Sequence, residues 1–363
     1  MKTFLNSIFI TQLFLVLAFS ERVLAQKTLQ DIGVSGQFFL SYEYDFYEDY
    51  ETNEFTVKRG YITFENDLSD KLGIRFTQDI TIDQEGDGSG DIELRLKYAL
   101  LNYAMDDIGI LTSPNIEMGV VHRPWIDFEQ NTNDFRVQKP MMLDQNEILA
   151  SADFGLQFEA GIGNELRTDQ QKGLKSNPAK YGSFSVGLYN GGGYSSLEMN
   201  NNKLFEARLS LRFFPRTIPG FQTSFLGAFG KGNIPESPDF QLIGSALTYE
   251  SEKVNFVFQG FQSTGDSSGR FVHPDSGSPY RLKGWSAFSD VKLFNSPVHV
   301  TLRYDELYNR DLNHLSVQQW VAGLAYIFKN RSKILLDVSR ENVNALLNSD
   351  GFTRFEVVTE VRF

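Results

Sequence analysis

Hydrophobic and polar residues alternate with a period of two along most of this chain, and helical periodicity is scarce. The clearest case is residues 298–305, where the two faces of the alternation are Val298, Val300, Leu302, Tyr304 and His299, Thr301, Arg303, Asp305. Successive side chains of a β-strand point to opposite faces, so the pattern predicts strands with one apolar and one polar face. It recurs in 71–82, 92–100 and 204–213, and it predicts an all-β fold.

About sixteen such segments follow one another, and each is near the ~10 residues that a tilted membrane-spanning strand needs. They lie near 34–45, 54–66, 71–83, 91–104, 114–123, 150–162, 180–190, 203–214, 220–230, 240–250, 253–263, 281–294, 298–308, 316–328, 332–340 and 352–363. About sixteen strands would enclose an aqueous lumen, whereas about eight would be filled by side chains.

The connections between the expected strands alternate between short and long. The short connections are 66–70, 215–220, 251–252, 295–297 and 329–331. The long connections include 84–90, 124–149, 191–202, 231–239, 264–280 and 341–351. Outer-membrane barrels have short periplasmic turns and longer external loops, so the alternation places both termini in the periplasm. The connection 163–179 departs from this pattern, because it should be a periplasmic turn and yet is long.

The C-terminus carries a sharper local signal. One face of the last expected strand is formed by Phe355, Val357, Thr359, Val361 and Phe363, and the chain ends on that last aromatic residue. This resembles the terminal strand of bacterial outer-membrane proteins, which the barrel assembly machinery reads. The alternative is an amphipathic strand at the end of a soluble sandwich. With the loop alternation, the pattern favours a transmembrane antiparallel β-barrel.

The N-terminus has the layout of a secretory signal peptide. Lys2 supplies a positive charge, 8–19 form a short apolar run, and Val23 and Ala25 precede the expected cleavage site. We therefore expect a signal peptide at 1–25 and a barrel domain at 26–363, located in the bacterial outer membrane. An N-terminal anchor is the alternative, but the apolar run is shorter than the ~20 residues of a spanning helix.

Composition agrees with an exported barrel. The chain has no Cys, and aromatic residues make up 14% of it, with 32 Phe and 15 Tyr that aromatic girdles would use. The net charge of −12 argues against a nucleic-acid partner. The expected partners are outer-membrane lipid and small polar or anionic solutes.

If the apolar faces point outward, a set of cations faces the lumen. The expected pore-lining and anion-binding residues are Arg59, Arg75, Arg95, Lys97, Arg123, Arg208, Arg212 and Arg303. Arginine suits an anion pathway because its planar guanidinium stays charged and matches phosphate and carboxylate oxygens. The alternative is that these cations pair with acidic residues on the same faces and merely keep the interior polar.

Two loops are candidates for more specific roles. Residues 124–149 are expected to constrict the lumen, since they hold both apolar anchors and polar tips: Trp125, Phe128, Arg136 and Lys139. Alternating oxygen ligands in 83–91 make a weak calcium candidate of Asp83, Glu85 and Asp87. A flexible acidic external loop explains the same residues better, because position twelve of such a site would be Leu94, not Glu.

The stretch 55–158 resembles the phosphate-selective porin O and P family. The positions that carry the resemblance are Lys58, Arg59, Asp70, Tyr98, Tyr103, Gly119, Pro124, Asp153 and Gly155. The resemblance implies a sixteen-stranded barrel, commonly a homotrimer, with a loop folded into the lumen and a basic anion pathway. The run of consecutive basic residues found in that family is shortened here to Lys58-Arg59.

The sequence therefore favours a passive porin for small polar solutes, preferring anions such as phosphate. A second hypothesis is a non-conducting barrel that presents loops 231–239 and 264–280 to partners. An enzyme is disfavoured, because the chain has four His without metal-ligand spacing and lacks a nucleophile-elbow motif. No cofactor is expected.

Overall fold

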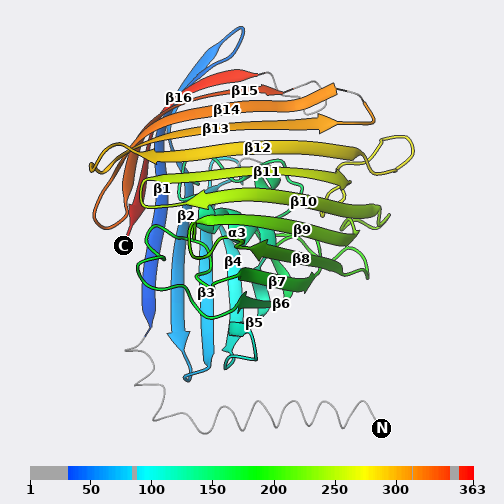
Figure 1. The fold of residues 1–363 in the computed structure, drawn as a ribbon. Helices are drawn as coiled ribbons and strands as arrows, with labels where there is room; N and C mark the ends of the chain where they lie inside the picture. The colour runs from blue at the N-terminus through cyan, green and yellow to red at the C-terminus, as the bar shows by residue number, and fades with distance from the viewer. Residues whose placement is uncertain (1–31, 84–87, 313, 344–350) are drawn as a thin grey trace, which may run out of the picture.

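The computed structural model describes residues 32–83, 88–312, 314–343 and 351–363, so the expected signal peptide lies outside the described residues. Its sixteen strands form one closed antiparallel barrel (Figure 1). Each strand pairs with its neighbours in sequence, and β1 pairs with β16 from Gln37–Arg362 to Phe46–Thr353, which closes the ring. The strands are β1 (Gly33–Phe46), β2 (Glu51–Asp67), β3 (Leu72–Ile82), β4 (Ile92–Ala104), β5 (Leu111–His122), β6 (Ala152–Ile162), β7 (Gly182–Tyr189), β8 (Leu204–Leu211), β9 (Phe221–Lys231), β10 (Asp239–Glu250), β11 (Val254–Thr264), β12 (Arg281–Lys292), β13 (Val298–Asn309), β14 (His314–Ile327), β15 (Lys333–Val343) and β16 (Phe352–Arg362).

The barrel and its strand number confirm the fold predicted from the alternation. Every expected segment corresponds to one strand, and the poorer matches differ by three residues at one end, as for 54–66 against Glu51–Asp67. The period of two fixes these boundaries well because a slip of one residue would turn every outward apolar side chain inward.

Connections of different length gather at the two ends of the barrel. The turn end carries the short connections, such as 68–71, 251–253 and 328–332, together with the start of β1 and the end of β16. The loop end carries the long ones, among them 123–151, 190–203 and 265–280. The long segment 163–181 between β6 and β7 lies at the turn end, so the strand count does not slip there.

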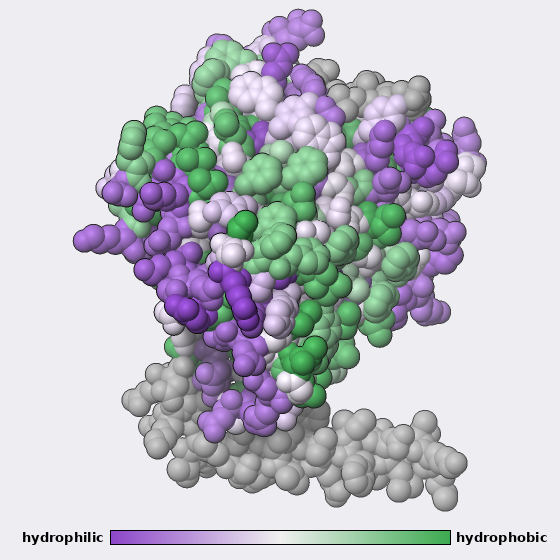
Figure 2. Space-filling model, viewed as in Figure 1, coloured by the Kyte–Doolittle hydropathy of each residue, from purple (hydrophilic) through white to green (hydrophobic). Residues whose placement is uncertain are grey.

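Large apolar side chains cover the outer surface of the strands. Figure 2 shows hydrophobic residues across the middle of the face toward the viewer, with hydrophilic residues gathered at both its left and its right margins. Examples of exposed outward side chains are Phe225, Phe256, Leu302, Trp320 and Leu336. A surface this apolar requires a non-aqueous environment, and it leaves the inner face of each strand to the lumen. No helix in the described part of the chain is long and apolar enough to cross a membrane.

The segment 123–151, which we call the inward loop, folds inside the ring of strands (Figure 1). It contains two helices, α3 (Pro124–Thr132) and α4 (Met142–Gln145). Pro124 begins α3, where its missing N–H has no intrahelical partner to lose. Contacts of α3 with β7 and β8 place it against that side of the wall.

Part of the lumen is filled by an apolar cluster instead of water. Trp125, Ile126, Phe128, Met142 and Leu143 of the inward loop pack in one cluster with inward side chains of β8 to β13, which include Leu204, Leu226, Phe240, Leu242, Phe261, Leu282 and Leu307. These strand positions were expected to face a polar lumen. They are apolar because the inward loop covers them, and burying their side chains holds the loop in place.

Candidate functional site: the lumen and its inward loop

The inward loop starts from a buried ion pair on β8. Arg123 is 0% exposed, and its Nε donates to Glu206 Oε2 at 2.8 Å. Glu206 Oε1 accepts the backbone N–H of Trp125 at 3.0 Å, so one carboxylate binds the loop twice. The Trp125 indole N–H donates to Gln259 of β11 at 3.3 Å. Arg123 therefore holds the loop and does not face the open part of the lumen.

Arg208 has a similar supporting position. Its Nε donates to the carbonyl of Pro124 at 3.0 Å, and its Nη2 lies 3.3 Å from Glu159. The guanidinium lies 5.5 Å from the ring centre of Phe128, which in turn packs on Trp125 with centroids 5.3 Å apart. The two expected apolar anchors of the loop thus lie together in the apolar cluster.

The far part of the inward loop reaches the opposite wall. Gln138 donates to Thr301 of β13 at 2.9 Å and to Asp337 of β15 at 2.8 Å. Lys139 pairs with Glu341 of β15 at 2.6 Å. Because these bonds lie across the barrel from the Arg123 anchor, the loop crosses the lumen.

Two further cations bind this far part of the loop or its neighbours. Arg303 donates to the carbonyl of Pro140 at 2.6 Å and pairs with Asp305 at 2.5 Å. Lys58 donates to the carbonyl of Gln138 at 2.9 Å. Arg303, expected to bind anions, is therefore occupied by its own carboxylate and by loop carbonyls.

Arg59 and Arg95 share one buried carboxylate. Asp79 is fully buried, and its Oδ2 accepts from Arg59 at 3.1 Å, from Arg95 at 2.9 Å and from the Tyr194 hydroxyl at 2.7 Å. This arrangement corresponds to the cross-strand pairing that the sequence left open. Part of the positive charge of the two arginines is neutralised.

Arg212 is buried near the turn end and faces backbone carbonyls instead of a cavity. It donates to Pro219 O at 2.5 Å, to Asn177 O at 3.1 Å and to the carbonyl of Ala179. It thereby ties the segment 163–181 to the turn that follows β8.

Lys97, Arg136 and Arg75 form an open cationic cluster around Tyr61. Lys97 Nζ and Arg136 Nη2 each lie 3.3 Å from the Tyr61 hydroxyl, which accepts from both. Among the described residues neither cation has a carboxylate within 4.0 Å, although the Asp144 carboxylate of α4 interacts electrostatically with both at longer range, and Arg75 is 3.5 Å from Glu65. All three line a polar cavity of about 360 Å³, into which Asp127 of α3 also faces.

A second polar cavity of about 650 Å³ lies at the turn end, between the inward loop and the segment 163–181. Asp134 borders it and lies 3.1 Å from Arg362, 3.5 Å from Arg331 and 3.7 Å from Lys333. Burial alone would raise the pKa of Asp134, but Lys333, Lys175, Arg362 and Arg331 hold it below its usual range. The two cavities share Gln130, Asn131 and Arg136, so they are parts of one polar space beneath α3.

One acidic side chain of the inward loop stands apart. Glu129 of α3 is 1% exposed, and neither of its oxygens has a hydrogen-bond partner among the described residues. Burial raises the pKa of Glu129 to about 8. Its neighbours Gln259 and Arg303 both favour the charged form, so the loss of hydration on burial outweighs their effect.

Only one of the three residues of the calcium candidate lies within the described residues. Asp83 closes a turn through backbone bonds with Gly90 and Asp91, whereas Glu85 and Asp87 lie outside the described residues. Within the ranges that the structure describes, no group of three or more His, Asp or Glu side chains is arranged to hold a metal ion.

No protein-family model and no curated protein matches this chain. Solved structures do match it over 92% of its length. The anion-selective porin from Comamonas acidovorans has a TM-score of 0.63 at 11% identity and is covered over 99% of its chain. The fold is that of a bacterial porin. The Salmonella typhi OmpF in complex with daunomycin gives 0.62 at 13% identity and 97% coverage. The trimer form of OmpT from Vibrio cholerae gives 0.54 at 9% identity and 99% coverage.

The porin fold supports the general resemblance seen in the sequence, while the phosphate-selective family stays a prediction. Sequence reasoning missed the partners that decide which cations remain open. Glu206, Asp79 and Tyr61 lie on inward faces, but the period of two cannot show which residues of different strands meet. The available signal was the presence of acidic residues on the same polar faces, Asp79 in 71–82 and Glu206 in 204–213, which leaves pairing with the cations open as the alternative.

Proposed function

We propose that the chain is an outer-membrane porin, a water-filled channel for passive diffusion of small polar solutes that favours anions. The observation that carries the proposal is the cluster in which Lys97 and Arg136 share the Tyr61 hydroxyl without a carboxylate partner. Lys97 is only 3% exposed, so its charge acts in a region from which bulk water is largely excluded.

The cluster lies where a charge has the greatest effect on permeating ions. Two unit charges 4 Å apart interact by about 1 kcal/mol in water and by about 4 kcal/mol near a protein surface. An anion beside Lys97 and Arg136 is therefore stabilised more than in bulk solution, while a cation is repelled. Clusters of basic side chains select anions in other pores by the same means.

The location rests on separate observations. The outward apolar surface fits a lipid bilayer, the N-terminal sequence has the layout of a cleaved signal peptide, and the aromatic Phe363 directly follows the last strand. A homotrimer is part of the proposal, since an OmpT structure of the same fold is described as a trimer form. Phosphate is a candidate solute, because guanidinium, ammonium and hydroxyl donors together suit its oxygens.

The test is ion selectivity in planar bilayers for wild type and for the double variant K97Q/R136Q. We expect the chloride-to-potassium permeability ratio to exceed one in wild type and to fall several-fold in the variant. The matched control is R216Q/K329Q, which removes the same charge from exposed side chains on turn-end connections. An equal fall in both variants would show that net charge, and not the cluster, sets the ratio.

One observation favours a second candidate, a non-conducting barrel that acts through its external loops. The inward loop contacts β8, β11, β13 and β15, and it buries an apolar cluster within the lumen. Intact, heat-modifiable barrels that give no conductance steps would support this candidate over the channel.

A further inference from the structure

The segment 163–181, which we call the strap, is built as a fixed element at the turn end. Its base is a short ladder in which Leu166 N–H donates to Pro178 O and Lys180 N–H donates to Asn164 O, each at 2.9 Å. Its tip reaches the turn between β10 and β11. There the backbone of Gly173 lies so close that a Cβ would stand 2.2 Å from Glu252 N, and its φ of +78° also favours glycine.

Three buried polar side chains of the barrel wall anchor the strap. Glu250 of β10 accepts the backbone N–H groups of Lys175 and Ser176, each at 3.3 Å. Gln222 of β9 donates to the Ser176 hydroxyl at 2.5 Å, and Arg212 donates to two strap carbonyls. All three anchors are 3% exposed or less, so the strap position is specified by buried hydrogen bonds.

The strap borders the 650 Å³ cavity, and most charges on the cavity wall cancel one another. Asp134 is surrounded by Arg331, Arg362 and Lys333, and the last of these also pairs with Glu360 at 2.8 Å. Asp290 pairs with His299 at 2.7 Å.

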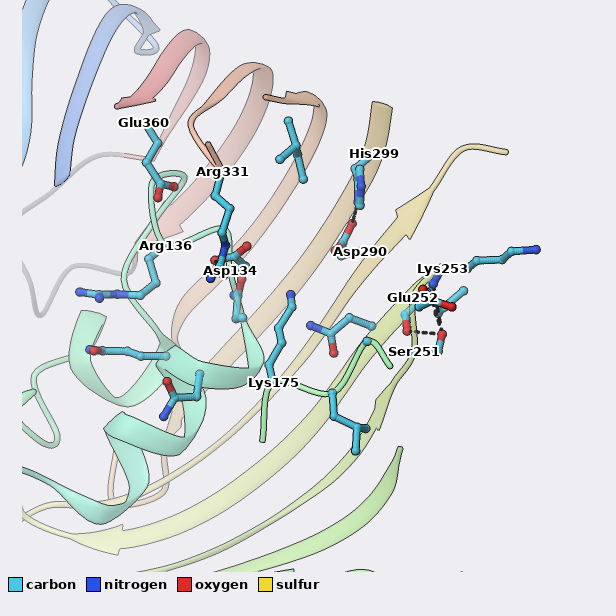
Figure 3. Close-up of a pocket in the computed structure, with 18 of the residues that line it drawn as sticks. Asp134, Arg136, Lys175, Ser251, Glu252, Lys253, Asp290, His299, Arg331 and Glu360 are labelled. Atoms are coloured by element: carbon cyan, nitrogen blue, oxygen red, sulfur yellow. Dashed lines mark hydrogen bonds and ion pairs between the residues drawn. The ribbon is translucent and has the colours of Figure 1, made fainter. Parts of the chain in front are cut away.

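Lys175 on the strap and Arg136 on the inward loop have no carboxylate within 4 Å among the described residues, although Lys175 is close enough to Asp134 to help lower its pKa, and the Glu252 carboxylate lies on the same wall. Figure 3 shows the Lys175 side chain extending toward the middle of the cavity, whereas the Arg136 guanidinium points away from Lys175 and Lys253 extends away from the cavity centre. Neither Lys175 nor Arg136 has an ion-pair partner among the described residues, and the amides of Asn133 and Asn255 lie on the same wall. Five cationic and four carboxylate side chains line the cavity, so it offers a small excess of positive charge together with neutral hydrogen-bond donors.

We propose that the strap lies across the turn-end opening of the lumen. Lys175 of the strap forms, together with Arg136, a second binding site for small oxyanions that leave the lumen, which we call the station. This inference rests on the proposed function, because it assigns a second selective residue to the same pathway. Arg136 borders both cavities, so an anion that leaves Lys97 passes Arg136 within the shared polar space and then reaches Lys175. Cationic side chains thereby continue along the proposed anion pathway from the inward loop to the turn end.

The absence of native Cys allows a charge-reversal test at one position. K175C becomes the only thiol of the chain and is labelled either with a cationic or with an anionic methanethiosulfonate reagent. The matched control is K172C, because Lys172 is an exposed strap residue that does not line the cavity. Permeability ratios in chloride salts and the half-saturating phosphate concentration for conductance are measured for each form.

We expect K175C to lower anion preference and to raise the half-saturating phosphate concentration by about three- to tenfold. The cationic label should restore wild-type values, and the anionic label should weaken anion preference further, with K172C unaffected. If the cationic and the anionic label on K175C gave equal permeability ratios and equal half-saturating phosphate concentrations, the station would be overturned. The proposed function would still stand if the wild-type channel preferred anions. A wild-type channel that prefers cations would overturn the proposed function, and the station with it.

Discussion

Removal of the Glu206 carboxylate should release the inward loop from the wall. Glu206 binds the loop twice, through the Arg123 guanidinium at 2.8 Å and the Trp125 N–H at 3.0 Å. Breaking a buried ion pair costs about 3–5 kcal/mol, because the remaining charge stays buried without its partner. Arg123 keeps Asp153 at 3.8 Å and the Tyr189 ring at 5.2 Å, so we expect the lower end of this range for E206A.

A loss of about 3 kcal/mol changes the ratio of seated to released loop by roughly a hundredfold. E206Q keeps an oxygen that can accept the Trp125 N–H, so its effect should be smaller than that of E206A. The expected result in bilayers is a larger and noisier single-channel conductance, in the order E206A, E206Q, wild type.

Trp125 reports the loop position directly. It is 1% exposed, whereas Trp285 and Trp320, the other two Trp of the chain, lie on the outer surface. In a W285F/W320F background, acrylamide should quench Trp125 more strongly after E206A. The control is E198Q, which removes an exposed carboxylate of the 190–203 loop. Quenching and conductance that match this control would refute the role assigned to Glu206.

Two further predictions concern single acidic residues. Because the pKa of Glu129 is raised to about 8, its contribution to loop stability is fully present below the ordinary pKa of about 4.5 and is lost as pH rises through 8. Trp125 quenching should therefore increase between pH 7 and 9 in wild type and stay constant in E129Q; parallel pH curves for the two proteins would contradict this assignment. D79N should raise the chloride-to-potassium permeability ratio, because it frees Arg59 and Arg95 from their shared carboxylate. An unchanged ratio in folded, heat-modifiable D79N would show that these arginines do not face permeating ions.

The strands could be predicted from the sequence because outward apolar residues must alternate with inward ones. The amphipathic terminal strand just before Phe363 favoured a closed barrel, and β1 does pair with β16. The alternation of loop lengths predicted one end with short turns and one end with long loops. The same reasoning located the inward loop, whose Trp125 and Phe128 pack inside the ring.

The lumen could not be predicted to the same depth. Inward positions such as Leu226 and Phe240 are apolar only because the loop covers them, and no local pattern records that contact. Which cations stay open depends on residues far apart in sequence, such as Asp79 beside Arg59 or Glu206 beside Arg123. The strap was visible only as an exception to the loop rule, since its anchors Glu250 and Arg212 lie on strands remote from it in the chain.

The central claim is that an open lumen with uncompensated positive charge passes anions in preference to cations. The most direct measurement is the zero-current potential of the wild-type protein in a planar bilayer across a tenfold KCl gradient. The account predicts conductance steps and a potential whose sign shows chloride to be more permeant than potassium. The opposite sign, or the absence of conductance from an intact heat-modifiable barrel, would contradict it.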